Sequence, residues 1–485
     1  MTATGQQTLA KGHARCPIFS QIAGFCKKLL NRTPQARAEQ ETLPLQPVVL
    51  TRDQHGISRQ QISDNALKVL YRLNKSGFEA YLVGGGVRDL LLGRQPKDFD
   101  IATSATPDQV KQLFSNCRLV GRRFRLAHIL FGRDVIEVAT FRGHHHQVNN
   151  NKNASDQSSE GMLLRDNVYG TIEEDAERRD FSVNALYYNI ADFSVVGFSN
   201  GLKDLENRSL ELIGDPETRY REDPVRMIRA VRFSAKLGLT ISPRTAAPIR
   251  DLAPLLGDIP PARLFEETLK LLLAGYGLET YHQLQRYDLF APLFPEAADV
   301  MGQDDNDYHR FLELALINTD ERIAKDMRVT PAFLYAALLW GPVETRTQQF
   351  MHEGGLNYYD AFLLAMDEVL GRQVKSVAIP RRFSSVVRDI WMLQDRLTKR
   401  SGKRPHRLLE HPKFRAGYDF LLLRAELDPK LKELADWWTE FQVANPVDRQ
   451  QLSRAAQARH NQFGGEDPAK ARKRPRRRPR KKKEA

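Results

Sequence analysis

The stretch YLVGGGVRDLLLGRQPKDFDIAT, residues Tyr81–Thr103, decides the fold of this chain. Its apolar start predicts a short buried strand that ends at the glycine triplet Gly84–Gly86, and GVRDLLLG then predicts a short helix closed by Gly93. DFDIAT predicts a second strand. Because side chains alternate along a strand, Asp98 and Asp100 are expected on one face of the sheet. The stretch therefore predicts a strand–helix–strand unit with a glycine loop close to two carboxylates.

This combination is typical of sites for phosphates and divalent metal ions. Neighbouring carboxylates repel each other unless a cation lies between them, and Mg²⁺ or Mn²⁺ takes oxygen ligands that it shares with substrate phosphates. Gly84 and Gly85 let backbone N–H groups approach a phosphate because no Cβ intervenes, and Arg88 adds positive charge. The sequence has no Gly-x-x-x-x-Gly-Lys-Ser/Thr motif, so a P-loop is not indicated. We expect a nucleoside triphosphate and a divalent metal.

Two residues compete for the place of a third carboxylate. Glu137 lies on the predicted strand DVIEVATF, where it is either a charge at the solvent edge of the sheet or a metal ligand. Asp180 follows Arg178 and Arg179 in RRDFSVNAL, where it either neutralises one of these arginines in an ion pair or serves as a catalytic carboxylate. The sequence leaves both alternatives open.

Outward from this unit, the pattern predicts an α+β chain. Strand and helix patterns alternate around a small mixed sheet, and from the stretch EDPVRMIRAVRF onward the apolar residues recur at helical spacing. We expect a flexible leader, a sheet-containing head, two all-helical domains and a disordered basic tail, over residues 1–55, 56–212, 213–300, 301–455 and 456–485. Trp437 and Trp438, in the second helical domain, either pack in its core or stack on bases.

The charge of the chain is concentrated at its end. The formal net charge is +13, and residues 472–485 alone carry ten basic residues and one acidic residue. Such a cationic segment predicts contact with a polyanion, either nucleic acid, which is favoured, or acidic lipid; the alternative is a solvated tail without a partner. The RNA-binding residues expected there are Arg472, Lys473, Arg474, Arg476, Arg477 and Arg478.

The rest of the composition bears on the compartment. Three cysteines without zinc spacing, Cys16, Cys26 and Cys117, fit a reducing cytoplasm. The nine residues of AFLYAALLW are far fewer than the roughly 20 that span a bilayer, so we expect no stable membrane insertion. Apolar residues at helical spacing near Ile18–Leu29 predict a leader helix that docks on a partner or is merely frayed, with a membrane-surface helix as the less favoured alternative.

Three motifs, taken in order, resemble those of the class II nucleotidyltransferases. LVGGGVRDLLLG…DFDIAT, RRDFSVNAL and EDPVRMIRAVRF are similar to the first, second and fourth motifs of this family, which contains bacterial poly(A) polymerases and CCA-adding tRNA nucleotidyltransferases. LVGRRFRLAHI, with Arg122, Arg123 and Arg125, resembles the segment that marks the poly(A) polymerase branch. The similarity continues through HPKFRAGYDFLLLRAE to the arginine-rich end. It implies a nucleotidyltransferase head followed by helical neck and body domains.

The resemblance also implies roles for individual residues. Asp98 and Asp100 are implied as metal ligands and catalytic residues, with Asp180 a further catalytic candidate, and Gly84, Gly85 and Arg88 as the triphosphate site. Arg178, Arg179 and Asp180 are implied to contact the nucleotide, and Glu222, Asp223 and Arg226 to face its base. Arg229 and Arg232 follow at three-residue steps and either share that face or pair with nearby acids. Arg122, Arg123 and Arg125 either hold the head to the neck or contact substrate.

The implied activity is template-independent addition of AMP from ATP to RNA 3′ ends by two-metal catalysis, which promotes RNA decay. The implied partners are RNA, ATP, the RNA-decay machinery and an RNA chaperone. Two alternatives remain at this stage. One is a CCA-adding enzyme, which adds CTP-derived and then ATP-derived nucleotides to a tRNA-like end, and the other is an RNA-binding scaffold that has lost catalysis.

Overall fold

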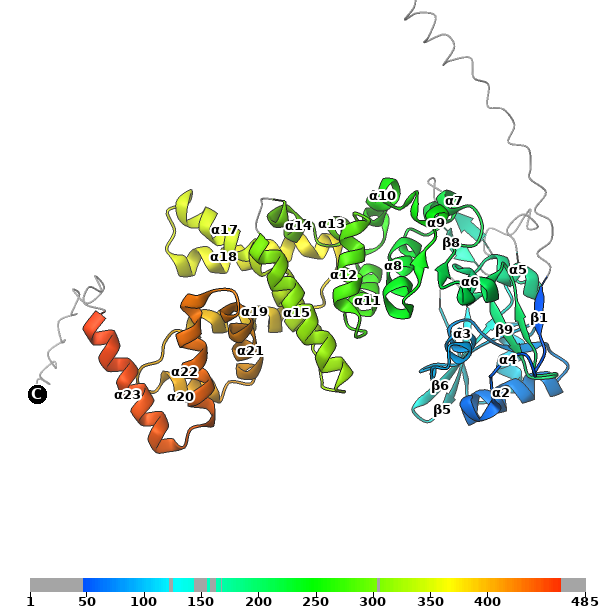
Figure 1. The fold of residues 1–485 in the computed structure, drawn as a ribbon, viewed down its shortest axis with the longest axis horizontal. Helices are drawn as coiled ribbons and strands as arrows, with labels where there is room; N and C mark the ends of the chain where they lie inside the picture. Colours follow the sequence, from blue (N-terminus) through cyan, green and yellow to red (C-terminus); the bar gives the residue numbers. More distant parts are fainter. Residues whose placement is uncertain are drawn as a thin grey trace, which may run out of the picture. The chain divides into compact units, whose positions relative to one another are not determined.

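The computed structural model describes residues 47–121, 125–143, 155–157, 163–166, 168–302 and 306–463. Most of the predicted leader, Arg122 and Arg123, and residues 464–485 of the predicted basic tail lie outside the described residues. The tail was expected to be disordered from residue 456, but residues 456–463 belong to helix α23 (Pro446–Phe463). By their contacts, the described residues from Pro47 onward group in one unit. Figure 1 traces the course of the chain through its strands and helices. The predicted α+β class is confirmed, because an eight-stranded sheet is followed by a long series of helices.

The head is built on this mixed sheet. Helices α2 (Asp64–Lys75), α3 (Gly85–Leu91), α4 (Pro107–Leu113), α5 (Ile172–Glu177) and α6 (Gly201–Glu206) accompany it. The spatial order of the strands is β1 (Val48–Leu50), β10 (Val195–Gly197), β9 (Leu186–Asn189), β2 (Ala80–Val83), β3 (Asp100–Thr103), β6 (Asp134–Thr140), β5 (Leu126–Phe131) and β4 (Cys117–Val120).

Local sequence explains several of these elements. Strands β5 and β6 form a tight hairpin at Gly132, because they pair up to Phe131 and Asp134 on either side of it. Helix α4 begins at a capping box, in which the Thr106 hydroxyl accepts a hydrogen bond from the backbone N–H of Gln109. Val48–Leu50 was assigned to the leader, but it forms the edge strand β1.

The second strand of the deciding stretch is shorter than expected. The sequence predicts a strand through both aspartates, but β3 begins at Asp100, and Asp98 lies in the loop before it. Strand β2 pairs with β3 so that Val83 lies opposite Asp100. The two carboxylates therefore lie at the start of a strand beside the end of β2, where the glycine loop begins.

Two small two-stranded sheets and a series of helices belong to the middle of the chain. A short parallel pair, β11 (Ser209–Leu210) with β12 (Thr240–Ile241), joins the end of the expected head to the helical region. The helices after it are α7 (Pro216–Glu222), α8 (Val225–Leu237), α9 (Pro243–Ala246), α10 (Ile249–Leu252), α11 (Pro261–Leu272), α12 (Gly277–Arg286), α13 (Phe290–Leu293) and α14 (Pro295–Met301). β7 (Ser155–Gln157) and β8 (Leu163–Asp166) form a separate two-stranded sheet.

The last part of the described chain is also helical. One apolar core extends from the head to α21 (Phe414–Ala425), and a second core lies among the helices from α19 (Arg381–Leu397) to α22 (Lys432–Val443). Trp438 is fully buried in that second core, and its indole N–H donates to the carbonyl of Leu397 at 2.8 Å, which confirms the core-packing alternative for this residue. The helices are α15 (Asn306–Ala324), α16 (Pro331–Leu338), α17 (Trp340–His352), α18 (Tyr358–Ser376), α19 (Arg381–Leu397), α20 (Arg404–Leu409), α21 (Phe414–Ala425), α22 (Lys432–Val443) and α23 (Pro446–Phe463).

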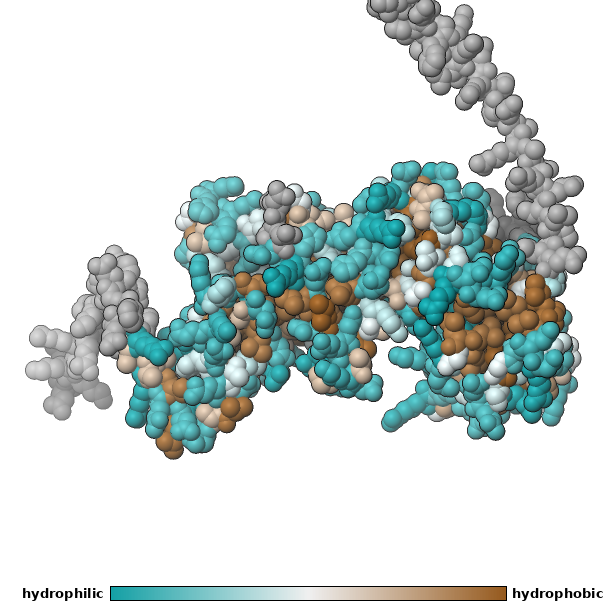
Figure 2. All heavy atoms as spheres, in the orientation of Figure 1, coloured by the Kyte–Doolittle hydropathy of each residue, from teal (hydrophilic) through white to brown (hydrophobic). Residues whose placement is uncertain are grey.

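Hydrophilic residues cover most of the visible face (Figure 2). In the same view, hydrophobic residues gather on the head around the elements that Figure 1 labels β1 and α6. Val48, Leu50 and Leu202 line a groove of about 630 Å³ there. Among the helices that the structure describes, none is long and apolar enough to cross a membrane.

Candidate active site

The glycine loop lies where β2 ends and α3 begins. Gly84 has a backbone torsion φ of +66°, a value that favours glycine, and its N–H donates to the carbonyl of Leu186 at 3.0 Å. A Cβ on Gly84 would lie 3.2 Å from Nη1 of Arg179, and a Cβ on Gly85 would lie 3.4 Å from Nη2 of Arg88. The glycines therefore allow two guanidinium groups to lie directly against the loop, as a phosphate site requires.

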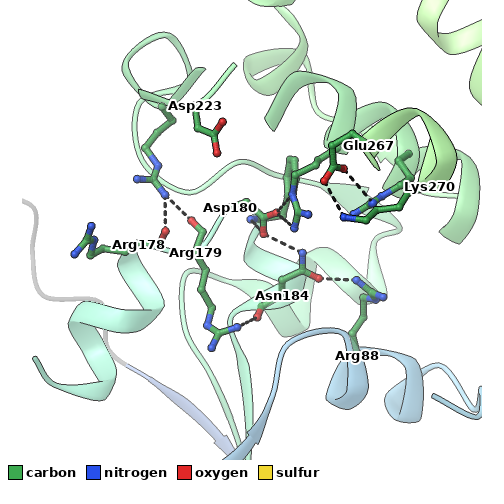
Figure 3. Close-up of polar contacts among 12 residues, drawn as sticks. Arg88, Arg178, Arg179, Asp180, Asn184, Asp223, Glu267 and Lys270 are labelled. Atoms are coloured by element: carbon green, nitrogen blue, oxygen red, sulfur yellow. Dashed lines mark hydrogen bonds and ion pairs between the residues drawn. The ribbon is translucent and has the colours of Figure 1, made fainter. Parts of the chain in front are cut away.

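Arg88 is buried although it is charged. Only 2% of the residue is exposed, and its guanidinium pairs with Asp89 at 2.7 Å. A second hydrogen bond runs from Nη1 of Arg88 to Oδ1 of Asn184 at 2.6 Å (Figure 3). These contacts fix the position of the guanidinium beside the glycine loop before any ligand binds.

Asp100 and Glu137 lie on adjacent parallel strands. Since Ile101 lies opposite Val138, the two acids that precede them are also neighbours and point to the same face. Partial removal of water raises the pKa of Asp100 to about 6, and repulsion from Glu137 and Asp98 adds to this effect although Arg179 opposes it. Glu137 is about half exposed and approaches Nε2 of His128 at 3.5 Å.

Asp98, Asp100 and Glu137 could supply some of the ligands of a divalent metal ion, but they do not enclose one by themselves. Within the described residues, no group of three or more His, Cys, Asp or Glu side chains is arranged to enclose a metal ion. Mg²⁺ does not need such a cage, since it commonly binds one or two carboxylates together with substrate phosphates and water. Asp98 and Asp100, which repel each other beside the two arginines, match that donor set, and Glu137 is the acid nearest in register to Asp100.

Arg179 is held by an acid that the sequence analysis did not identify. Asp175 is 3% exposed, and its Oδ2 accepts from Nη2 of Arg179 at 3.0 Å and from the hydroxyl of Tyr187 at 2.8 Å. Burial alone would raise the pKa of Asp175, but Arg179, Arg142 and the Tyr187 hydroxyl hold it below its ordinary value. The spacing of four residues between Asp175 and Arg179 was the available signal.

Asp180 pairs with a different arginine from those expected. The sequence suggested Arg178 or Arg179, but Asp180 Oδ2 accepts from Nε of Arg229 at 2.8 Å and from its Nη2 at 2.5 Å. Oδ1 accepts from Nδ2 of Asn184 at 3.0 Å. Although burial opposes it, Arg229 and these hydrogen bonds hold the pKa of Asp180 well below its ordinary value. Asp180 is therefore ionised and already paired with Arg229.

Asn184 links Arg88 to the ion pair of Asp180 and Arg229 through hydrogen bonds. Its amide donates to Asp180 and its carbonyl oxygen accepts from Arg88, so the order is Arg229, Asp180, Asn184, Arg88 (Figure 3). The motif RRDFSVNAL contains Asn184, yet the sequence analysis gave it no role.

Helix α7 holds the Arg178–Arg179 segment through Arg219. Nη2 of Arg219 donates to the backbone carbonyls of Arg178 at 2.8 Å and Arg179 at 2.7 Å, and Nη1 pairs with Glu222 at 2.8 Å. Burial, and then repulsion from Arg226, lowers the pKa of Arg219 to about 10. Arg178 itself is 8% exposed and donates to the carbonyl of Gly143. Arg219 was not identified from the sequence.

The expected base-facing residues lie at the junction of α7 and α8. Arg226 donates to the carbonyl of Arg219 at 2.6 Å and pairs with Glu222 at 2.9 Å. Asp223 pairs with Arg263 at 2.8 Å. These contacts bring Glu222, Asp223 and Arg226 together, as the sequence predicted for one segment, and hold each of them in a polar network.

Three arginines surround one aromatic ring beside this network. The guanidinium carbons of Arg88, Arg229 and Arg232 lie 5.2, 5.2 and 4.9 Å from the centre of the Phe233 ring. Arg232 also approaches Glu267 at 3.4 Å, and Lys270 pairs with the same carboxylate at 2.9 Å. Both arginines of α8 that the sequence left open are thus paired with acids.

The segment that marks the poly(A) polymerase branch is described only in part. Arg125 approaches Asp108 of α4 at 3.5 Å, with both side chains well exposed, so this ion pair lies within the head. Arg122 and Arg123 lie outside the described residues, as do Arg472, Lys473, Arg474, Arg476, Arg477 and Arg478.

Family models match three parts of the chain. The model described as "Poly A polymerase head domain" matches residues 80–211 and contains the glycine loop and both aspartates. "Probable RNA and SrmB-binding site of polymerase A" matches residues 238–301. "Polymerase A arginine-rich C-terminus" matches residues 354–482.

Relatives match nearly the whole chain. The chain is 58% identical to poly(A) polymerase I of Escherichia coli O6:H1 over 435 residues, 89% of this chain and 93% of that protein. It is 52% identical to poly(A) polymerase I of Haemophilus influenzae over 450 residues, 92% of this chain and 98% of that protein. The crystal structure of Bacillus stearothermophilus CCA-adding enzyme in complex with CTP has the same fold, with a TM-score of 0.51, 23% identity, and coverage of 83% of this chain and 93% of that chain. From its motifs, its fold and these relatives, the chain belongs to the poly(A) polymerase I family of nucleotidyltransferases.

Proposed function

We propose that this chain transfers AMP from ATP to the 3′-hydroxyl of RNA, releases pyrophosphate and repeats the step without a template. The observation that carries the proposal is the position of Arg88 and Arg179 against the glycine loop, beside the end of the strand pair that carries Asp100. Two fixed guanidinium groups suit a triphosphate, and the repelling carboxylates suit the metal that accompanies it.

The residues have separate tasks in this mechanism. Arg88 and Arg179 bind and orient the triphosphate so that the α-phosphate faces the incoming hydroxyl, while Asp175 and Asn184 keep both arginines in place. When bound by Asp98 and Asp100, Mg²⁺ or Mn²⁺ supplies charge neutralisation and activates the hydroxyl as a Lewis acid.

The nucleotide base is read on the other side of the site. We assign Asp223 and Arg226 to the base, with Glu222 holding Arg226 in position, and Arg178 to the nucleotide between base and phosphates. Arg219 connects both halves because it contacts Glu222 and the carbonyls of Arg178 and Arg179. Glu137 is the stronger candidate for a third metal-side carboxylate, since Asp180 is already paired with Arg229.

Primer extension with each of the four nucleoside triphosphates tests this function. We expect efficient addition of many AMP units to an unstructured RNA primer in Mg²⁺, weak use of the other three nucleotides, and loss of activity with a chelator. Failure to incorporate ATP into RNA under any metal condition would contradict the proposal and favour a scaffold that has lost catalysis.

A CCA-adding activity is the alternative within the same fold. The arginine-rich C-terminal match and the identity over nearly the full length of poly(A) polymerase I relatives favour polyadenylation. The same assay separates the two activities, because a CCA-adding enzyme would use CTP first and stop after a short addition to a tRNA-like end.

The remaining assignments follow from this activity. RNA with accessible 3′ ends, both messenger and small RNA, is the proposed substrate, and the tails would mark it for decay. Contact with the decay machinery and an RNA chaperone, and location in the cytoplasm, stay predictions. Co-purification from cells with and without ribonuclease treatment would distinguish protein contacts from shared RNA.

A further inference from the structure

A cavity of about 710 Å³ lies among helices that supply no residue to the candidate active site. Its walls are the second half of α15, the segment 325–330, the start of α16, and parts of α19 and α21. α15 and α21 contact each other directly (Figure 1). The volume lies within the range of roughly 300–1,000 Å³ that is typical of ligand sites.

The floor of the cavity is apolar and includes an aromatic ring. Phe333, Val386 and Leu422 line it, and Phe333 is only partly buried. The ring of Phe333 packs edge to face against Phe420, with centroids 5.8 Å apart and an interplanar angle of 74°. Phe420 is fully buried, so the Phe333 ring is fixed in position while part of its surface remains open.

The rim carries more basic than acidic side chains. Arg322 of α15 and Arg415 of α21 share one carboxylate, that of Asp419, at 3.9 and 2.9 Å. Because one negative charge serves two guanidinium groups, this part of the rim stays positive. Lys325 is balanced by Glu321 at 3.4 Å.

Two further rim cations have no ion pair. Among the described residues, no carboxylate pairs with Arg328 or Lys413, and Glu426 is the one rim acid that has no basic partner there. Lys413 belongs to the motif HPKFRAGYDF, which the candidate active site does not use. This motif therefore forms one wall of the cavity with its cations at the mouth.

We propose that this cavity binds a nucleotide of single-stranded RNA upstream of the 3′ end, with a base on the apolar floor and backbone phosphates at Arg328 and Lys413. The inference rests on the proposed function, because it takes RNA as the substrate. Stacking on an aromatic ring together with cations along the strand is how proteins bind single strands without reading sequence. A protein partner is the less favoured occupant, because unpaired cations at the mouth match phosphates.

The first test exchanges the rim charges. The variant Arg328→Glu/Lys413→Glu is compared with the control Lys68→Glu/Lys375→Glu, which makes the same charge change at exposed residues outside the cavity. The measurements are KM for oligoadenylate primers of increasing length, KM for ATP, and the salt dependence of RNA binding by fluorescence anisotropy without ATP.

We expect the rim variant to raise KM several-fold for long primers only, and to leave KM for short primers, KM for ATP and kcat unchanged. Its log–log salt slope should decrease by about 0.7 for each lost phosphate contact. An equal change in the control, or unchanged long-primer KM and salt slope in the rim variant, would overturn the proposal. A cavity that serves a protein partner would give that second result.

The second test removes the ring but keeps apolar volume, with Phe333→Leu. Weaker binding of long RNA at an unchanged melting temperature supports a base on the floor, and unchanged binding contradicts it. If wild-type protein adds no AMP to any primer, the proposed function fails by itself. If wild-type protein adds AMP and both cavity variants match it, only the cavity proposal fails.

Discussion

The candidate active site and the body cavity both gather arginines, but they hold them differently. Arg88 and Arg179 are tied to Asp89, Asn184 and Asp175 and are largely removed from solvent. At the cavity, Arg415 keeps 69% of its side chain exposed even in its ion pair. Transfer chemistry needs groups fixed in advance, whereas the binding of a flexible polyanion tolerates mobile charges. The predictions below separate these two uses of positive charge.

The largest effect is expected at the carboxylates beside the glycine loop. Asp98→Ala or Asp100→Ala removes a proposed metal ligand, and AMP addition should fall by about 10³-fold or more. Steady-state assays in Mg²⁺ measure this, and circular dichroism should show an unchanged fold because neither side chain belongs to an apolar core. Substantial Mg²⁺-dependent activity in either variant would remove that residue from the mechanism.

Asp175→Asn tests whether the reaction with ATP depends on the ion pair that holds Arg179 in position. Loss of the buried charge leaves Arg179 without its main ionic partner, so kcat/KM for ATP should fall by about 10–100-fold. KM for RNA should stay close to wild type. Asp64→Asn, at an exposed helix start, is the matched control and should leave both constants unchanged. Equal losses for ATP and RNA would indicate general unfolding instead.

Asp180→Asn tests the partly buried ion pair between Asp180 and Arg229 through acid stability. The folded pKa of Asp180 is lowered, so its stabilising effect is present above the unfolded pKa of about 3.9 and is lost as the pH falls below it. We expect the variant to lose about 3 kcal/mol of unfolding free energy at neutral pH and to approach wild type at acidic pH. Denaturant unfolding at a series of pH values gives both numbers, and a loss of the same size at every pH would contradict the ionic account.

The basic segment at the chain end should have a smaller effect on activity. Deletion of residues 472–485 removes ten cations. The RNA KM should rise and the log–log salt slope should flatten by about 0.7 for each phosphate that the segment neutralises. Single-turnover addition at saturating RNA should be unchanged. A deletion variant with the wild-type salt slope would show that these cations do not contact RNA.

The smallest effect is expected at Arg125, whose ion pair with Asp108 is exposed. Arg125→Ala should change the unfolding free energy by less than about 1 kcal/mol, because exposed pairs contribute little. A large loss of activity with normal stability would show instead that this residue contacts substrate.

The deciding stretch specified much of the fold from sequence alone. Its glycines, apolar run and acids predicted β2, α3 and β3 because each depends on local residue preferences. The strand limits were less predictable: Asp98 lies before β3, since pairing with β2 extends only to Asp100 and Val83. Val48–Leu50 joins the sheet through contact with a strand about 150 residues later, which no local pattern encodes.

The candidate site was predicted as a set of residue types but not as a network. Asp98, Asp100, Arg88 and Arg179 could be proposed from sequence because their motifs are local. Asp175 and Arg219 were missed, because their importance arises from contacts with partners on other elements. The pairing of Asp180 with Arg229 joins residues 49 positions apart, which sequence spacing cannot indicate.

The two carbonyl contacts of Arg219 have a consequence for how substitutions combine. The guanidinium group of Arg219 joins helix α7 to the successive peptide groups of Arg178 and Arg179, which we assign to the nucleotide. Any tilt of that helix is therefore transmitted to both of them together. A substitution at a residue assigned to the base and a substitution at a residue assigned to the phosphates should then show energetic coupling in a thermodynamic double-mutant cycle. Their effects should not add as independent losses.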